Sequence, residues 1–210
     1  MNLIASEAHP HPLHFPTIVF GLPAWVHDIV RPGDVIASRE ERMRLAIRLA
    51  SENVARDTGG PFGAAVFERD SGRVVSVGVN LVVPSCCSLA HAEAIALALA
   101  QQACGSHDLS APGLPPLELV STAQACCQCY GIVWWSGIRS LVVAARNDDV
   151  ETVAGFSEGP IPKDWATQLR DRSGLPSVSV EVDFLREESL VPLRTFRELG
   201  RSMYQPGGFR

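Results

Sequence analysis

Apolar residues recur at two different spacings along this chain, and the spacing separates expected helices from expected strands. Residues 38–56 show the helical spacing of three and four, with an apolar face made of Met43, Ile47, Ala50 and Val54. Ser38 and Glu41, three positions apart, match a capping box at the start of this segment. The pattern therefore predicts an amphipathic helix with a defined N-terminus.

The remaining apolar segments alternate between strand-like and helix-like runs. Strands are predicted at residues 62–68, 74–80, 117–122, 139–146 and 176–182. Helices are predicted at residues 89–104, 127–137, 163–172 and 186–203. The first two strands form a hairpin, and the later alternation of strands and helices indicates an α/β fold with a layered sheet covered on both faces.

The 210 residues divide into an N-terminal arm, residues 1–37, and one domain, residues 38–210, that ends in a C-terminal helical extension. A chain of this length that is 46% hydrophobic is expected to bury one core. The arm is rich in proline and histidine and has no apolar period, so it predicts an irregular, mobile segment. Metal binding by the arm remains an alternative, through His9, His11 and His14.

Composition excludes several partners. The net charge is -5 and no run of Lys or Arg is present, which argues against nucleic acid. Apolar runs stay far below the roughly 20 residues that cross a bilayer, so no membrane span is expected. The N-terminus lacks the pattern of a signal peptide, which predicts cytoplasmic residence and cysteines that serve as thiols or metal ligands. The six cysteines are Cys86, Cys87, Cys104, Cys126, Cys127 and Cys129.

His91 and Glu93 interrupt a small, apolar run that starts a predicted helix. Two positions apart, they point in different directions on a helix, so both reach one point only from the first turn, beside a cavity. Taken alone, the pair is more typical of a partly exposed helix start. A second motif favours a functional interpretation, because Cys126 and Cys129 have the spacing of two zinc ligands near a helix N-terminus. Cys127 would diverge from them and is assigned as a structural thiol.

A zinc ion held by His91, Cys126 and Cys129 would keep one tetrahedral position open, as catalytic zinc sites do. Water bound there is acidified toward neutrality and becomes a nucleophile. Proton transfer to a leaving group still needs a carboxylate that is not itself a ligand, and Glu93 is placed to serve.

His91-Ala92-Glu93 with Cys126-x-x-Cys129 resembles the signature of the cytidine deaminase superfamily. The resemblance covers roughly residues 40–160 and is closest to the guanine deaminase branch, some members of which also accept triazines such as ammeline. Further matching segments are Gly60 to Ala64, Asn80, Gly131, Trp134 to Gly137, Asn147 to Asp149, and Gly155 with Phe156. The resemblance implies a three-layer α/β/α cytidine deaminase-like fold around a mixed five-stranded sheet, in a homodimer that often exchanges C-terminal segments.

The resemblance also implies substrate contacts. Asn80 would hold the base, Phe62 would stack on it, and the backbone N–H of Ala92 would bind an oxygen or ring nitrogen. Asp148 or Glu151, after the fourth strand, would contact the base and move protons to the departing amine. Each has a plainer interpretation: Asn80 as a strand end, Phe62 as core, and Asp148 as part of a solvated turn.

Some positions depart from the pattern of the family. Gln124 and Ala125 stand where Glu and Pro are usual before the first cysteine, and Leu89 stands where Thr or Ser is common. These changes alter the walls near the metal and leave substrate identity more open than reaction type. Trp134 and Trp135 are adjacent on a helix and cannot both line one pocket; Trp135 is taken as the substrate contact.

The expected function is hydrolytic deamination of a free aminopurine-like base, with guanine to xanthine plus ammonia as the first choice. In the expected reaction Glu93 activates the water and returns its proton to a ring nitrogen. Alternative substrates are an s-triazine such as ammeline, guanosine, cytosine and cytidine. Two rival functions are a tRNA adenosine deaminase, against which the acidic charge argues, and a non-catalytic, zinc-stabilised binding module.

Overall fold

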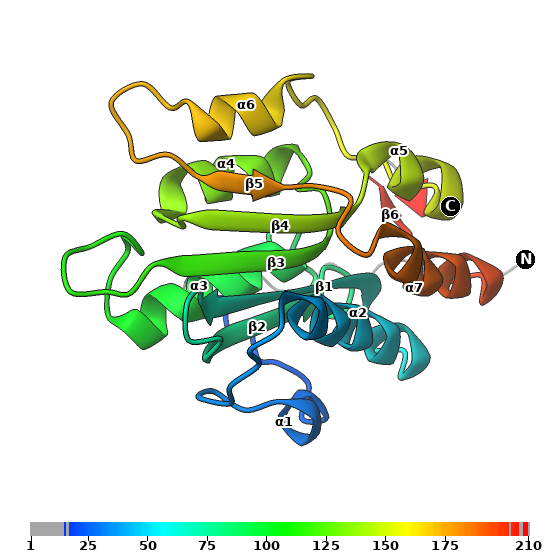
Figure 1. Cartoon of the computed structure of the whole chain (residues 1–210). Helices are drawn as coiled ribbons and strands as arrows, with labels where there is room; N and C mark the ends of the chain where they lie inside the picture. The colour runs from blue at the N-terminus through cyan, green and yellow to red at the C-terminus, as the bar shows by residue number, and fades with distance from the viewer. Residues whose placement is uncertain (1–14, 16, 202, 206–207, 210) are drawn as a thin grey trace, which may run out of the picture.

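A five-stranded mixed sheet forms the centre of the protein, shown in the computed structural model of Figure 1, which describes residues 15, 17–201, 203–205 and 208–209. Its strands are β1 (Gly60–Glu68), β2 (Val74–Asn80), β3 (Leu117–Ala123), β4 (Ser140–Ala145) and β5 (Ser179–Glu181). They lie in the order β2-β1-β3-β4-β5. Pairing is antiparallel from β2 to β3 and parallel from β3 to β5, which confirms the predicted mixed sheet.

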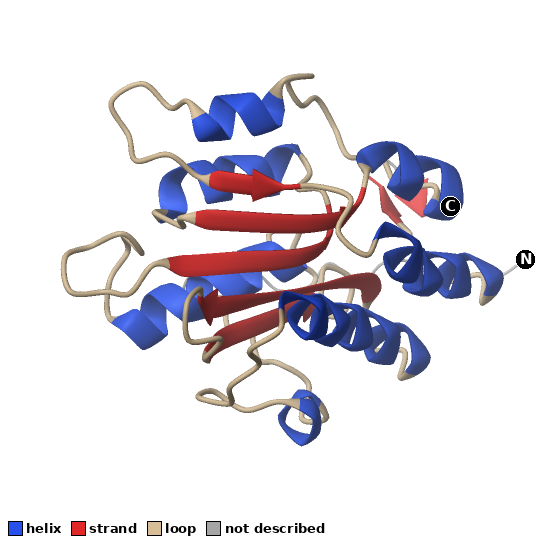
Figure 2. Cartoon of the chain, in the orientation of Figure 1, coloured by secondary structure: helices blue, strands red, loops and turns tan. Residues whose placement is uncertain are grey.

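Helices cover both faces of this sheet, as Figure 2 shows. The longer ones are α2 (Arg39–Ala55), α3 (Ala92–Cys104), α4 (Cys127–Ser136) and α7 (Arg186–Glu198), and α6 (Trp165–Arg170) is shorter. Neighbouring residues of β1 point to opposite faces: Ala65 and Phe67 pack into a core with α2, and Ala64 and Val66 pack into a second core with α3 and α4. The arrangement is the expected three-layer α/β/α fold.

Two glycines let helices lie directly on the sheet. A Cβ atom at Gly63 would come within 2.3 Å of the carbonyl oxygen of Ala46 in α2. A Cβ atom at Gly78 would come within 2.1 Å of the carbonyl oxygen of Ala92, the first residue of α3. Only glycine allows this close approach, which fixes the height of the α3 N-terminus above the sheet.

A buried ionic cluster joins α2 to the edge of the sheet where β3 and β4 begin. Glu118 is fully buried and accepts hydrogen bonds from Arg39 at 2.8 Å, Arg42 at 2.9 Å and Ser140 at 2.9 Å. Arg39 also pairs with Glu181 of β5 at 2.8 Å. The cluster therefore connects one helix to three strands.

The described part of the N-terminal arm packs on the body of the protein. Residues 1–14 and 16, including His9, His11 and His14, lie outside the described residues. Further along, α1 (Val26–Ile29) packs on the core through the buried side chains of Trp25, Val26 and Val30. Three apolar side chains therefore anchor this segment, most of which has no regular secondary structure.

The second half of the chain contains short elements that the periodicity missed. A one-turn helix, α5 (Asn147–Asp149), continues into a π-helix, η1 (Val150–Ala154), directly after β4. The helix α7 ends at Glu198 and not at residue 203, and the short strands β6 (Tyr204–Gln205) and β7 (Gly208–Phe209) follow it.

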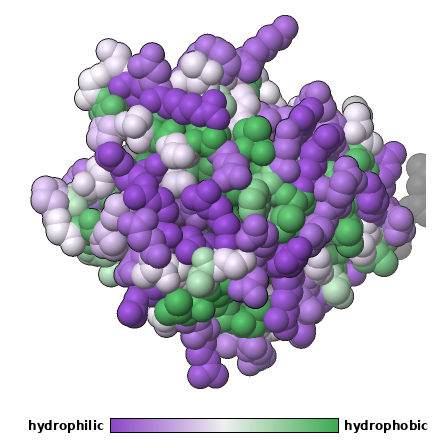
Figure 3. All heavy atoms as spheres, in the orientation of Figure 1, coloured by the Kyte–Doolittle hydropathy of each residue, from purple (hydrophilic) through white to green (hydrophobic). Residues whose placement is uncertain are grey.

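None of the described helices is long and apolar enough to cross a membrane. The face that carries α2 and α7 is mainly hydrophilic (Figure 3).

Candidate active site

Two helix N-termini bring His91, Cys126 and Cys129 together. His91 is the N-cap of α3 and Cys126 is the N-cap of α4, which follows β3. The His91 Nδ1 atom lies 3.4 Å from Cys126 Sγ and 3.6 Å from Cys129 Sγ, and the three ligand atoms are all within 4.8 Å of one another. Bonds of about 2.0 Å to nitrogen and 2.3 Å to sulfur around one tetrahedral ion need separations of this size.

The thiols of the cluster are electrostatically matched to a cation. A hydrogen bond from the Cys129 thiol, together with one from His91, lowers the pKa of Cys126 to about 4, although burial acts in the opposite direction. The hydrogen bond to Cys126, together with burial, raises the pKa of Cys129 well above the usual value. The hydrogen bond and charge of Cys126 raise the pKa of His91 against the effect of burial. Without a metal, therefore, the two sulfurs share a proton that a bound cation would displace.

Glu93 lies beside this cluster in the first turn of α3. Its side chain is 6% exposed and accepts hydrogen bonds from Ser121 Oγ at 3.1 Å and from the Cys129 thiol at 3.5 Å. Burial and the Cys126 thiolate raise the pKa of the Glu93 carboxyl. A buried carboxylate of raised pKa suits proton transfer near neutral pH.

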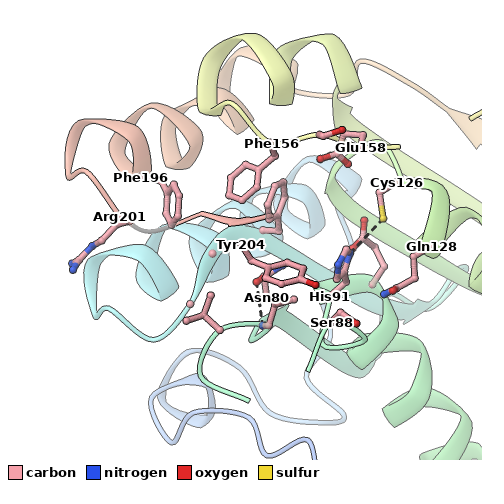
Figure 4. A pocket seen from close by; sticks show the side chains of 18 of the residues that line it. Asn80, Ser88, His91, Cys126, Gln128, Phe156, Glu158, Phe196, Arg201 and Tyr204 are labelled. Carbon is pink, nitrogen blue, oxygen red and sulfur yellow. Dashed lines mark hydrogen bonds between the residues drawn. The ribbon is translucent and has the colours of Figure 1, made fainter. Parts of the chain in front are cut away.

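An elongated cavity of about 1140 Å³ opens from the cluster (Figure 4). Figure 4 shows His91 and Cys126 at one end and Arg201 at the other, and Glu93 also lines the cavity. Aromatic side chains form part of its wall: Phe62 and Phe156 are in edge-to-face contact, with ring centroids 5.2 Å apart. Other lining residues are Thr58, Asn80, Ser88, Gln128, Glu158, Phe196 and Tyr204.

The structure places the predicted substrate contacts unequally. Asn80 and Phe62 line the cavity, and Ala92 is buried between His91 and Glu93 at the start of α3. Trp135 is 74% exposed on α4 and is not among the described residues that line the cavity. Trp134 packs against the core, and because adjacent residues of a helix point in different directions, Trp135 faces the surface.

The predicted acidic partners also lie elsewhere. Asp148 and Glu151 are exposed in α5 and η1, and neither belongs to the described lining of the cavity. An acidic side chain that does line the cavity belongs to Glu158, which is 9% exposed. Burial, with the negative charges of Cys126 and Glu93, raises the pKa of Glu158 to about 8. The sequence offers one signal for it, an acidic residue shortly after Phe156.

The three positions that depart from the family pattern have different surroundings. Gln124 lines the cavity, Ala125 is buried beside the cysteines, and Leu89 is half exposed. Only Gln124 among them therefore faces the space where a substrate would lie.

The zinc-binding region of cytidine and deoxycytidylate deaminases matches residues 36–145, more than half of the chain. A solved structure of guanine deaminase from Nitrosomonas europaea is 46% identical, with a TM-score of 0.81 over 88% of this chain and 99% of that one. Another, in complex with 2,6-diaminopurine, is also 46% identical, with a TM-score of 0.82 over 90% of this chain and 97% of that one.

Guanine deaminase from Bacillus subtilis (strain 168) is 28% identical over 160 residues, which are 76% of this chain and 94% of that protein. The TM-scores of the two solved structures show that they share the overall fold of this chain. The chain belongs to the cytidine and deoxycytidylate deaminase family, as a zinc-dependent hydrolytic deaminase of the guanine deaminase-like branch.

Proposed function

We propose that the protein deaminates free guanine, giving xanthine and ammonia. One observation carries the proposal: a His/Cys/Cys cluster and an unligated buried carboxylate, Glu93, meet at the end of a cavity with aromatic walls. The relatives of 46% and 28% identity that are described as guanine deaminases support guanine as the base.

The metal assignment follows from the donor set. One imidazole and two thiolates at mutual distances suited to a tetrahedral ion favour Zn²⁺, and His91, Cys126 and Cys129 would hold it. The bound ion would supply acidification of a water molecule. The remaining steps belong to side chains of this chain.

Glu93 moves protons at the reacting carbon. Ser121 holds one of its carboxylate oxygens, which fixes the side chain toward the cluster. Glu93 takes a proton from the attacking water and delivers it to a ring nitrogen next to the amino-bearing carbon. The buried position limits contact of the carboxyl group with bulk water.

Glu158 replaces Asp148 and Glu151 as the proposed proton carrier for the departing amine. It reaches the cavity from the loop after η1, where its backbone carbonyl accepts a hydrogen bond from Cys127 N at 3.0 Å. A carboxyl group with a pKa near 8 is protonated in part at neutral pH and can donate to ammonia as it leaves.

Asn80 and the two phenylalanines would hold the base. The Asn80 Oδ1 atom accepts from Val82 N at 3.4 Å, which leaves the amide nitrogen to donate to the base. Phe62 and Phe156 provide aromatic surface for a flat heterocycle. The backbone N–H of Ala92, in the first turn of α3, is the proposed donor to an oxygen or nitrogen near the metal.

A homodimer is the proposed assembly, with α4 at its interface. Trp135 presents a large apolar side chain on this helix, and a Cβ atom at Gly131 would meet no atom within 4 Å. Such a face suits packing against a second copy. Sedimentation of Trp135→Glu should show monomers where the wild-type protein shows dimers; an unchanged dimer contradicts this interface.

Cytoplasmic residence and the absence of a nucleic-acid partner remain predictions from the sequence. All six cysteines are free, which fits a reducing compartment.

Ammonia release over a panel of substrates tests the proposed function. Guanine should be turned over with a kcat/KM well above those of guanosine, adenine, cytosine, cytidine and ammeline. A higher kcat/KM for ammeline or for a nucleoside would show that the substrate is a triazine or a nucleoside and not a free purine base. Binding of tRNA at moderate salt would favour the tRNA deaminase. Bound zinc with no turnover of any compound would favour the non-catalytic module.

A further inference from the structure

A chain of side-chain hydrogen bonds runs from the N-terminal segment to the wall of the cavity. The indole Nε1 of Trp25 donates to Thr58 Oγ1 at 3.2 Å, and that hydroxyl donates to Asn53 Oδ1 at 2.7 Å. The amide nitrogen of Asn53 donates to the backbone carbonyls of Gly60 at 2.8 Å and Asn80 at 2.9 Å. Each donor in this chain has an acceptor, so the orientation of every group is fixed.

Asn53 holds together the two strand ends that form this part of the cavity. It is fully buried in α2, while Gly60 begins β1 and Asn80 ends β2. The space around the Asn80 carbonyl is closed on its other side, because a Cβ atom at Gly59 would come within 1.9 Å of that oxygen. The backbone carbonyl of Asn80 is therefore held on two sides, and its side chain is held separately by the hydrogen bond from Val82 N to Oδ1.

Thr58 and Trp25 in turn fix the orientation of the Asn53 side chain. Thr58 accepts from the indole and donates to the amide, so its hydroxyl determines which end of the Asn53 side chain faces the two carbonyls. Trp25 is 8% exposed and lies under Arg56, whose guanidinium carbon is 5.7 Å from the ring centroid. Trp25 lies outside residues 36–145, the part that matches the deaminase zinc-binding region.

We propose that Trp25, Thr58 and Asn53 are positioning residues that orient Asn80 toward the substrate, so that the N-terminal segment completes the binding site. The proposal rests on the proposed function in one respect, the role of Asn80 as a contact to the base. None of the three residues is assigned a part in proton transfer.

Thr58→Val removes one hydroxyl and keeps the size of the side chain, and Trp25→Phe removes the indole N–H together with part of the ring. Either change should raise KM for guanine roughly two- to tenfold, the effect of losing one hydrogen bond, with kcat and zinc content within about twofold of wild type. Thr58→Ser keeps the hydroxyl and should restore the wild-type KM. Trp134→Phe is the matched control: Trp134 packs against Tyr130 on α4, apart from the described lining of the cavity.

A second readout does not depend on guanine turnover. The side-chain amide signals of Asn53 and Asn80 in ¹⁵N–¹H spectra should shift in Thr58→Val and Trp25→Phe and stay in place in Trp134→Phe. In a Glu93→Gln background the same two changes should weaken binding of 2,6-diaminopurine by the factor seen in KM.

A failure of guanine turnover in the wild-type protein would count against the proposed function. The positioning role would then be tested by the amide signals and the binding constants, which do not require turnover. Unshifted Asn80 signals, unchanged binding, or equal effects from Trp134→Phe would overturn that role.

Discussion

Replacement of Glu118 by glutamine should destabilise the fold far more than any exposed charge change. Glutamine keeps the size of the side chain and removes the charge that pairs with Arg42, which is itself 4% exposed. Arg42 also donates to the carbonyls of Ile36, Ala37 and Arg69, so its guanidinium cannot leave the site easily. The variant would keep a buried cation without its carboxylate.

Breaking one side of a buried ion pair costs about 3–5 kcal/mol. For a domain of about 200 residues, each kcal/mol lowers the melting temperature by roughly 2–4 °C, so a fall of roughly 6–20 °C is expected. Urea unfolding followed by circular dichroism gives the free energy directly. Because Glu118 is not among the described residues lining the cavity, zinc content and KM should not change in the folded variant.

The matched control is Glu188→Gln, which removes the partner of Arg44 in an exposed pair. Water screens that pair, so its loss should leave the melting temperature within error of the wild-type value. A loss of less than about 1 kcal/mol in Glu118→Gln would refute the reasoning about burial.

Two further substitution pairs separate neighbouring residues in the site. Cys126→Ser should lose stoichiometric zinc, measured by elemental analysis, whereas Cys127→Ser should retain it, because Cys127 is exposed and is not in the ligand cluster. Zinc retained in Cys126→Ser would contradict the ligand set. Glu158→Gln should lower kcat by about 10²–10⁴-fold, the usual contribution of a general acid, with zinc unchanged. Glu151→Gln is its exposed control; a loss of the same size there would restore the original assignment.

Periodicity predicted the sheet and the main helices because their buried faces follow fixed spacings. The ends of β1 and β2 and the capped start of α2 agree with the structure within a few residues. The π-helix η1 does not follow the spacing of three and four that marks an α-helix, and the chain turns at Gly155 directly after it. The number of residues after β4 therefore could not tell which acidic residue reaches the cavity.

The metal cluster was predictable for a different reason. The spacing of Cys126 and Cys129 and the position of His91 at a helix start are local properties, and the cluster needs only that two helix N-termini meet. Contacts between distant segments are not local: Trp25 and Thr58 are 33 residues apart, and no pattern along the chain connects them. Composition likewise does not tell which of two adjacent aromatic residues faces outward, and in the structure it is Trp135 that is exposed.

The most direct test of the central claim compares Glu93→Gln with the wild-type protein in metal content and in ammonia release from guanine. The account predicts one zinc ion per chain in both proteins, because glutamine leaves the three ligands in place, and turnover in the wild-type protein alone. Wild-type protein without zinc, or Glu93→Gln with full ammonia release, would contradict it.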